Sequence, residues 1–356
     1  MKTISLCMIV KDEEAVLDKC LKSVHDLVDE IIIVDTGSTD KTKEIAKKYT
    51  DKIYDFKWVD DFAKARNYSF SKATKDYIFW LDADDYMPEE DRKKFKELRK
   101  TIDGSVDIYT MIYIYSRDKN GNPTYVQRKH RLLKRENNYK WESPIHEFIN
   151  PTGKIKQTDI KIIHNKIKIN DPKRNRRIFE KMIKEGHKFT LREEFCYARE
   201  FYYSKEIPEA IDKYERFVKK TIGEYQKNKH CLYLALLELS DCYNMIGNSQ
   251  KELDTLFLIL KNQLPTVKCL YKIGDNFRRQ KKYNQAVYWL ELAENTKDNS
   301  NNPEYEKYLV YLDLGVCYYY LKEYQKAYDT NEKAGKIIPN DKTYLGNKQI
   351  YEKYLK

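Results

Sequence analysis

Short apolar runs alternate with stretches of helical spacing through the first half of the chain. The runs rich in β-branched and apolar residues are predicted strands, at residues 4–10, 30–34, 52–56, 77–81, 106–115 and 160–165. Between the first four, apolar residues recur with helical periodicity, which predicts helices at residues 12–24, 41–49 and 61–74. This alternation predicts an α/β fold with a mostly parallel, Rossmann-like sheet and right-handed crossovers.

The second half of the chain carries a different pattern, because strand signals stop near residue 173 and helical spacing continues to the end. A small residue is followed three positions later by an aromatic residue, in four copies that begin at Ala198, Ser240, Gly274 and Gly315. In every copy except the one at Ser240, an alanine follows twelve positions after the small residue. This spacing resembles the tetratricopeptide repeat, in which helix pairs stack on one another. We therefore predict an α/β domain over residues 1–170 and an all-α tetratricopeptide-repeat domain over residues 171–356.

Composition narrows the range of functions. The net charge of +11 comes from lysines spread along the whole chain among acidic residues, so no nucleic-acid partner is expected. The seven cysteines are odd in number and form no CxxC pair, which argues against a disulfide framework and against a zinc site. The apolar run at residues 4–10 is too short for a signal peptide or a membrane span. We expect a cytoplasmic protein without an integral membrane segment.

Three carboxylates, Asp82, Asp84 and Asp85, directly follow the predicted strand at residues 77–81. Open α/β sheets bind ligands just beyond the carboxyl ends of their strands, and Mg²⁺ or Mn²⁺ prefers carboxylate oxygens. The pattern therefore favours a divalent metal that meets a phosphorylated substrate, with an acidic turn as the alternative. Asp35 ends another strand, where it can accept hydrogen bonds from a nucleoside or, alternatively, cap the backbone of the turn that follows.

The segments SLCMIVKDEE, IIIVDTGSTDKT, FAKARN and FWLDADD, in this order and spacing, resemble the family 2 glycosyltransferases, which have the GT-A fold. The resemblance covers residues 2–170 and implies a nucleotide-sugar donor and a divalent metal. It also implies roles for individual residues: Ile9, Val10 and Lys11 line the base pocket, Asp35 contacts the nucleoside, Arg66 lies near the base or the phosphates, Asp82 faces the ribose, Asp84 binds the metal and Asp85 supports it.

The acceptor side is expected within residues 101–170. Arg131 precedes an apolar pair, as in the family, and is expected to neutralise phosphates. An inverting transferase needs a general base, which the resemblance places at Glu147, with Glu142 as the main competitor and His146 shaping the acceptor pocket. His164 is expected to complete the metal shell, although a lone histidine at a strand end is more often structural.

A glycosyltransferase fused to helical repeats resembles the enzymes that glycosylate bacteriocin peptides, such as the sublancin-type S-glycosyltransferases. The resemblance implies inverting, metal-dependent transfer of a hexose to Cys, Ser or Thr of a peptide or protein held by the repeats. UDP-glucose and UDP-N-acetylglucosamine are the expected donors, with Mn²⁺ or Mg²⁺ as the metal. Two alternatives stay open: a cell-envelope glycan or lipid-linked acceptor, and a non-catalytic repeat scaffold. A homodimer through the helical half is also open.

Overall fold

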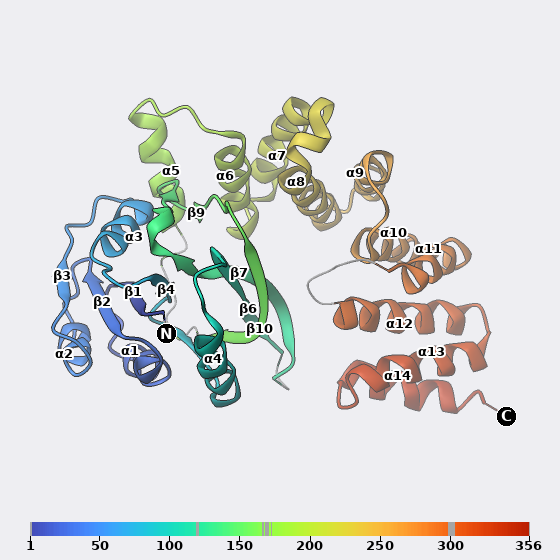
Figure 1. The fold of residues 1–356 in the computed structure, drawn as a ribbon. Coiled ribbons are helices and arrows are strands. Elements are labelled where there is room, and N and C mark those ends of the chain that lie inside the picture. The colour runs from blue at the N-terminus through green and yellow to red at the C-terminus, as the bar shows by residue number, and fades with distance from the viewer. Residues whose placement is uncertain are drawn as a thin grey trace. The chain divides into compact units, whose positions relative to one another are not determined.

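The protein is described here by a computed structural model of residues 2–118, 121–165, 167, 171, 173–297 and 303–355. The chain divides into two compact units, residues 1–187 and residues 188–356 (Figure 1). The first unit includes the helix α5 (Arg174–Lys184). The domain boundary that the sequence places between residues 170 and 171 adjoins residues outside the described part, and it stays a prediction.

An eight-stranded sheet forms the centre of the first unit, in the order β3-β2-β1-β4-β7-β6-β10-β5. Its strands are β1 (Ile4–Val10), β2 (Glu30–Asp35), β3 (Ile53–Asp55), β4 (Tyr77–Trp80), β5 (Asp85–Tyr86), β6 (Ile108–Arg117), β7 (Pro123–Lys134) and β10 (Ile155–His164). The first four strands along the chain are parallel, and so are β6 and β10, whereas β7 is antiparallel to β4 and β6. The predicted mostly parallel α/β sheet is confirmed. Two short strands, β8 (Trp141–Glu142) and β9 (Phe148–Ile149), pair separately.

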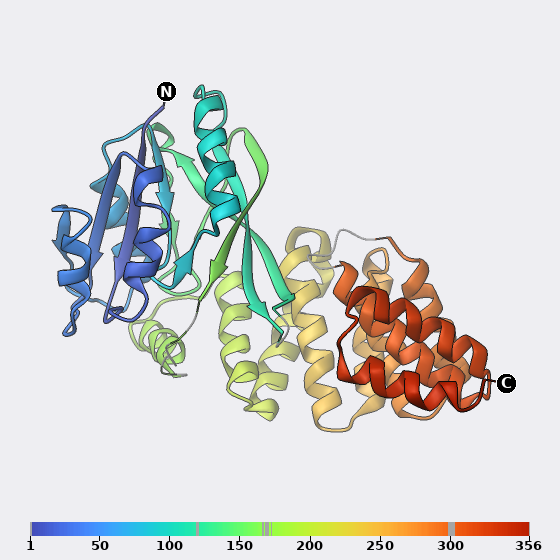
Figure 2. The same cartoon turned by 90° about the horizontal axis from the view of Figure 1, so that it is seen from below.

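Helices cover both faces of the sheet (Figures 1 and 2). The helices α1 (Leu17–Lys22), α2 (Thr42–Lys47) and α4 (Glu89–Thr101) contribute to one apolar core, and α3 (Phe62–Ser71) contributes to the other. Side chains alternate between the two faces of a strand, so successive residues of β1 pack into different cores. Leu6 and Met8 lie in the first core and Cys7 lies in the second.

The helix predicted at residues 12–24 is shorter than expected, because it begins only at Leu17. The residues before it form a loop that is tied to the loop after β2 and to the first residue of α2. The backbone N–H of Asp12 donates to Ser38 Oγ over 2.9 Å, and that of Glu13 donates to Thr42 Oγ1 over 2.7 Å. These bonds to another segment replace the intrahelical bonds that the apolar spacing suggested.

The described part of the second unit is helical, as predicted. Its helices are α6 (Leu191–Tyr203), α7 (Ile207–Thr221), α8 (Tyr225–Met245), α9 (Ser249–Asn262), α10 (Val267–Arg279), α11 (Tyr283–Asn295), α12 (Pro303–Tyr320), α13 (Tyr324–Ile337) and α14 (Lys342–Glu352). The small residue of each sequence repeat lies in α6, α8, α10 or α12, and the position twelve residues later, an alanine in three of the four copies, lies in the next helix. The tetratricopeptide-repeat architecture is confirmed.

The irregular repeat has a physical explanation. Glu252 of α9 occupies the position at which the other three repeats have an alanine, and it is nevertheless buried. Its carboxylate accepts two hydrogen bonds from Arg279, at 2.7 and 2.8 Å, and one from Asn276 Nδ2, also at 2.7 Å. A buried carboxylate is tolerated when it is paired and hydrogen-bonded in this way.

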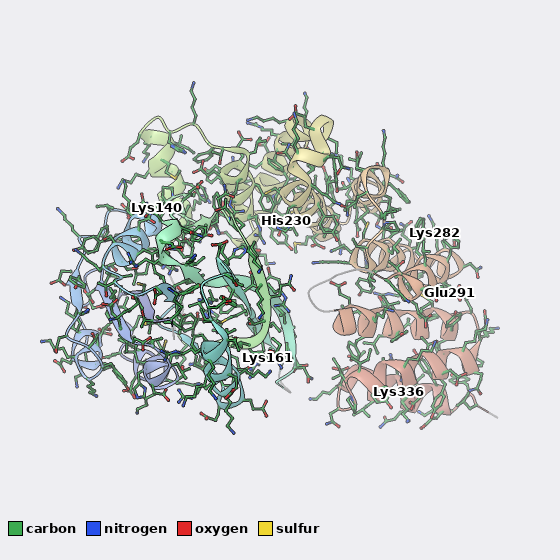
Figure 3. The ribbon with its side chains drawn as sticks, in the orientation of Figure 1. Lys140, Lys161, His230, Lys282, Glu291 and Lys336 are labelled. Carbon is green, nitrogen blue, oxygen red and sulfur yellow. The ribbon has the colours of Figure 1, made fainter. Side chains whose placement is uncertain are left out.

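Positive charge is dispersed, as the sequence suggested. The lysines labelled in Figure 3 lie in different parts of the chain: Lys161 in β10, Lys336 in α13, Lys140 in the segment before β8 and Lys282 directly before α11. None of the described helices combines the length and the hydrophobicity that a membrane-spanning helix requires.

The close approach of paired helices can be tested at Gly274. A Cβ added there would lie 2.6 Å from Leu290 Cγ on the partner helix, whereas a Cβ added at Gly346 in α14 would meet no atom within 4 Å. We expect Gly274→Ala to destabilise the second unit by about 1–3 kcal/mol through overpacking. Gly346→Ala is the matched control and should be neutral or stabilising by up to about 1 kcal/mol. Urea unfolding followed by circular dichroism measures both, and equal stabilities would contradict the packing described.

Candidate active site

Three parallel strands bring their carboxyl ends to one edge of the sheet. Val10 lies opposite Asp35 in the β1–β2 register, and Cys7 lies opposite Trp80 in the β1–β4 register. Asp82 follows the end of β4, so it lies at the edge at which β1 and β2 also end. This is the edge at which open α/β sheets bind ligands.

Asp35 has one satisfied and one unsatisfied oxygen. Its Oδ1 accepts the backbone N–H groups of Gly37 and Ser38, both over 2.9 Å, as the turn-capping alternative predicts. Its Oδ2 is buried, and no described group donates a hydrogen bond to it. An unsatisfied buried acceptor is costly, so this oxygen is ready to accept an N–H group of a ligand. Ile9, half-buried, and Lys11, exposed, flank Val10 at the same edge of the sheet.

Arg66 joins two of the predicted functional carboxylates. Its Nη2 donates to Asp82 Oδ1 over 2.7 Å, and its Nε donates to Glu147 Oε1 over 2.8 Å. The rings of Trp80 and Trp141 lie against its guanidinium, with their centroids 5.1 and 4.9 Å from Cζ. Arg66 therefore has little freedom to move, and it holds the predicted donor-site carboxylate and the predicted base close together.

The charge on Asp82 is maintained by its neighbours. Burial alone would raise the pKa of Asp82, but the positive charges of Arg66, Arg131 and Lys129 outweigh burial and hold this pKa below its usual range. Asp82 is therefore ionised at neutral pH.

Glu147 reaches Arg66 from the loop between β8 and β9. His146, next to it, adopts a positive φ of 53° and stacks on Phe179 of α5, with 6.1 Å between ring centroids. This unusual backbone conformation turns the loop just before Glu147. Glu142, the competing candidate, lies on β8 with an exposed side chain. Of the two, Glu147 is the one that Arg66 contacts.

Asp85 is buried and fully engaged. Its Oδ2 accepts from Arg131 Nη2 over 2.9 Å, and its Oδ1 accepts from the hydroxyl of Tyr113 over the same distance. Arg131 is the extra residue of a β-bulge, because the β7 partners step from Leu132 to His130 between consecutive residues of β6. Its side chain is buried, and its Nη1 also donates to the carbonyl of Trp80 over 3.1 Å. Arg131 thus supports Asp85, and the phosphate contact that the sequence suggested for it stays a prediction.

Asp84 and His164 come together through the pairing of β5 with β10. In that register His164 lies opposite Asp85. The Nδ1 atom of His164 lies 3.4 Å from Asp84 Oδ1 and 3.5 Å from Asp85 Oδ1; it is buried and makes no hydrogen bond with any residue that the structure describes. Ligand atoms of these three residues lie within 4.8 Å of one another. The sequence-predicted pair of Asp84 and His164 is therefore adjacent in space.

The chemistry of this cluster fits a hard divalent cation. Carboxylate oxygen and imidazole nitrogen suit Mn²⁺ or Mg²⁺, and Asp84 and His164 have ligand atoms to offer. Both oxygens of Asp85 already accept hydrogen bonds, so it serves better as a support. Burial lowers the pKa of His164, but Asp84 and Asp85 outweigh burial and raise it to about 9. The negative field that attracts a proton to His164 would equally attract a metal ion.

Two residues of this cluster were not predicted from the sequence motifs. Tyr113 donates to Asp85, and Lys129 of β7 lies with its Nζ 4.1 Å from the centroid of the Tyr113 ring. Lys129 stands two positions before Arg131, so strand periodicity could have placed both on one face of the sheet. Tyr113 has no such signal, because its role depends on a contact between distant segments.

The segment that carries these residues matches a known protein family. Residues 5–164 match the family model described as glycosyl transferase family 2. These residues form a family 2 glycosyltransferase domain. All the candidate site residues named above, from Ile9 to His164, lie inside the matched segment of this glycosyltransferase domain.

Relatives match to different extents. A TPR repeat-containing protein of Synechococcus elongatus is 38% identical over 149 residues, which are 42% of this chain and 36% of that protein. The SPbeta prophage-derived glycosyltransferase SunS of Bacillus subtilis is 29% identical over 282 residues, which are 74% of this chain and 64% of SunS. The chain thus spans between about a third and two thirds of the length of these curated relatives.

Among solved structures, the glucosyl-3-phosphoglycerate synthase of Mycobacterium tuberculosis in complex with Mg²⁺ and UDP is 21% identical. The similarity covers 32% of this chain and 44% of that one, with a TM-score of 0.28. A likeness this slight carries no argument about function.

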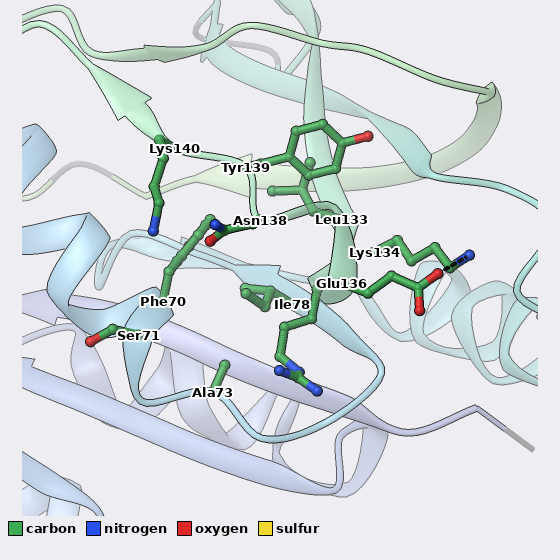
Figure 4. Close-up of a pocket in the computed structure, with 11 residues that line it drawn as sticks. Phe70, Ser71, Ala73, Ile78, Leu133, Lys134, Glu136, Asn138, Tyr139 and Lys140 are labelled. Atoms are coloured by element: carbon green, nitrogen blue, oxygen red, sulfur yellow. Dashed lines mark ion pairs between the residues drawn. The ribbon is translucent and has the colours of Figure 1, made fainter.

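A cavity of about 430 Å³ lies elsewhere in the glycosyltransferase domain (Figure 4). Its lining includes Ile78 near the start of β4 and Leu133 near the end of β7, so it lies towards the end of these strands that is opposite to Asp82. Lys134 and Glu136 on its rim form an ion pair. None of the predicted site residues lines this cavity, which is therefore separate from the candidate active site.

The buried pair of Arg131 and Asp85 can be tested by removing the cation. Arg131→Met leaves Asp85 buried without compensation, so we expect the glycosyltransferase domain to lose about 3–5 kcal/mol of stability. Arg128→Met, at an exposed position of the same strand, is the control and should change stability by less than about 0.5 kcal/mol. Urea unfolding monitored by tryptophan fluorescence measures the difference, and equal stabilities would contradict the role assigned to Arg131.

Proposed function

We propose that this protein is an inverting, metal-dependent glycosyltransferase that moves a sugar from a nucleotide-sugar to a peptide or protein. One observation carries the proposal: Arg66 holds Asp82 of the DxD segment and Glu147 together, beside the pair formed by Asp84 and His164. Donor, metal and base functions thus have residues within one small region of the family 2 domain.

We assign the nucleotide of the donor to residues at the carboxyl ends of β1, β2 and β4. Asp35 offers its free Oδ2 to an N–H group of the nucleoside, and Ile9, Val10 and Lys11 border the same place. Asp82, ionised and held by Arg66, accepts from the ribose hydroxyls. UDP-glucose and UDP-N-acetylglucosamine are the donors to test first, since UDP is the nucleotide expected for this family.

The metal is assigned to Asp84 and His164, with Asp85 fixed behind them by Arg131 and Tyr113. A divalent cation bound there supplies positive charge to the diphosphate, which stabilises the leaving group. The contribution of the protein is to hold the carboxylates and the imidazole in the positions that the cation requires.

Glu147 is assigned as the general base. A single displacement with one base inverts the configuration at the anomeric carbon: the acceptor proton passes to a Glu147 oxygen as the acceptor attacks. Glu142 is the alternative base, but its side chain is exposed and the structure pairs Arg66 with Glu147 instead. His146, next to Glu147, shapes the acceptor side.

The acceptor is assigned to the second unit. The match to SunS covers 74% of the chain, which is more than the 187 residues of the first unit, so it extends into the helical repeats. Stacked helix pairs offer an extended surface for a polypeptide. The seven cysteines are all free thiols, which suits a reducing cytoplasm. The alternative acceptor is a glycan or a lipid-linked molecule. A non-catalytic scaffold would show neither the metal-dependent UDP binding nor the donor turnover that the experiments below measure.

The metal assignment predicts the behaviour of Asp84→Asn. We expect the variant to lose Mn²⁺-dependent UDP binding by at least about 10-fold and donor turnover by about 10²–10³-fold, because the ligand charge is lost. EDTA should have the same effect on the unmodified protein. Calorimetric titration and donor-hydrolysis assays measure both quantities.

The matched control is Asp159→Asn, an equally conservative change at an exposed position of β10. It should leave UDP binding and turnover unchanged. Metal-dependent binding in Asp84→Asn at the level of this control would remove Asp84 from the metal site.

The base assignment predicts a split between binding and turnover. Glu147→Gln should keep UDP-sugar affinity within a few-fold and lower kcat by about 10²–10⁴, since the amide cannot take the acceptor proton. Hydrolysis of the donor, in which water replaces the acceptor, gives a measurable rate before the acceptor is identified. Glu142→Gln is the matched control, and the opposite ranking of the two variants would make Glu142 the base.

A further inference from the structure

One cation of the active site is not used by the roles assigned so far. Lys129 of β7 is half-buried, with its Nζ 4.1 Å from the centroid of the Tyr113 ring and 5.8 Å from that of Trp80. The guanidinium of Arg131 lies against the same two rings, with Cζ 3.9 Å from Trp80 and 4.7 Å from Tyr113. Lys129 and Arg131 therefore project together from β7 towards the carboxylates that follow β4.

Lys129 differs from the two arginines because no described carboxylate forms an ion pair with it. Arg66 donates to Asp82 and Glu147, and Arg131 donates to Asp85. Within the residues that the structure describes, Lys129 has no carboxylate within 4.0 Å and donates no hydrogen bond; its contacts are with aromatic rings.

The ammonium is held there at an energetic cost. Burial and the neighbouring charge of Arg131 lower the pKa of Lys129 to about 8, against the favourable fields of Asp82 and Asp85. A cation in such a place gains stability when an anion approaches, because the anion replaces the hydration that burial removed. The aromatic rings fix the direction of the side chain, so the charge is already oriented before a ligand arrives.

The remaining charges of the site indicate which kind of anion would bind next to Lys129. Asp82, Asp85 and Glu147 are each paired with an arginine, which leaves Asp84, beside His164, for the metal. A divalent cation at Asp84 together with Lys129 would give the site excess positive charge at two separate points. A diphosphate carries negative charge on two adjacent groups and matches that arrangement, whereas a single carboxylate does not.

We propose that Lys129 contacts the diphosphate of the nucleotide-sugar donor and stabilises the charge on the departing nucleoside diphosphate. This inference rests on the proposed function and names a residue that the family motifs leave unassigned. As the bond from the anomeric carbon to the β-phosphate oxygen breaks, its electron pair stays on that oxygen, next to the ammonium of Lys129. The acceptor proton goes to Glu147, so Lys129 provides charge and transfers no proton.

The test compares UDP with uridine in the presence of Mn²⁺ on the full-length protein. We expect Lys129→Met to weaken binding of Mn²⁺·UDP by about 10–100-fold, the size of a charge-assisted hydrogen bond, and to leave uridine binding within about 2-fold. Lys129→Arg should recover most of the UDP affinity, because it restores the charge. Arg128→Met removes one positive charge from the adjacent, exposed position and should have no effect.

The outcomes separate this inference from the proposed function. If the unmodified protein binds UDP with Mn²⁺ and Lys129→Met binds it as well as Arg128→Met does, Lys129 does not contact the diphosphate. Equal losses for UDP and uridine would likewise overturn the inference, because they indicate a disturbed pocket. If the unmodified protein binds none of UDP, GDP and dTDP with Mn²⁺, the proposed function itself fails, and the inference fails with it.

Discussion

The active site depends on keeping negative charge at the end of a buried strand. Asp85 is fully buried beyond the end of β4 and Asp82 is half-buried, and an unpaired charge is costly in such places. Arg66 from α3 and Arg131 from β7 offset this cost by direct ion pairs of 2.7 and 2.9 Å. Since the two arginines come from opposite sides of β4 in the sequence, the charge can be held only when the sheet and α3 are assembled. Both ion pairs therefore depend on the assembled domain.

The aromatic side chains make these ion pairs rigid. Trp80 contacts both arginines, and its indole N–H donates to the carbonyl of His130, which fixes the ring against β7. Trp141 completes the enclosure of Arg66. These rings cover part of each guanidinium, and an ion pair with less contact to water is stronger than one at the surface. Charged and aromatic residues therefore depend on one another here, because each arginine needs both its carboxylate and the rings beside it.

The sequence predicted what depends on local pattern and missed what depends on distant contacts. Strands β1, β2 and β4 and the helical repeats carry their periodicity within a few residues, and they were predicted correctly. The helix α4 was not predicted, although Glu89 and Glu90 in its first turn and basic residues in its last turn are typical helix signals. The pairing of β5 with β10 and the bulge at Arg131 join segments that are far apart in the chain. No local sequence pattern predicts such contacts.

Sharing Arg66 between two carboxylates links the donor side of the site to the base. Its Nη2 donates to Asp82 and its Nε donates to Glu147, so one guanidinium sets the spacing between the residue assigned to the ribose and the residue assigned to the acceptor proton. The rings of Trp80 and Trp141 hold that guanidinium in place. Because the two carboxylates are positioned before a ligand arrives, little of the site has to rearrange when donor and acceptor bind. The contact between α3 and the loop before β9 therefore matters to catalysis as much as the carboxylates themselves do.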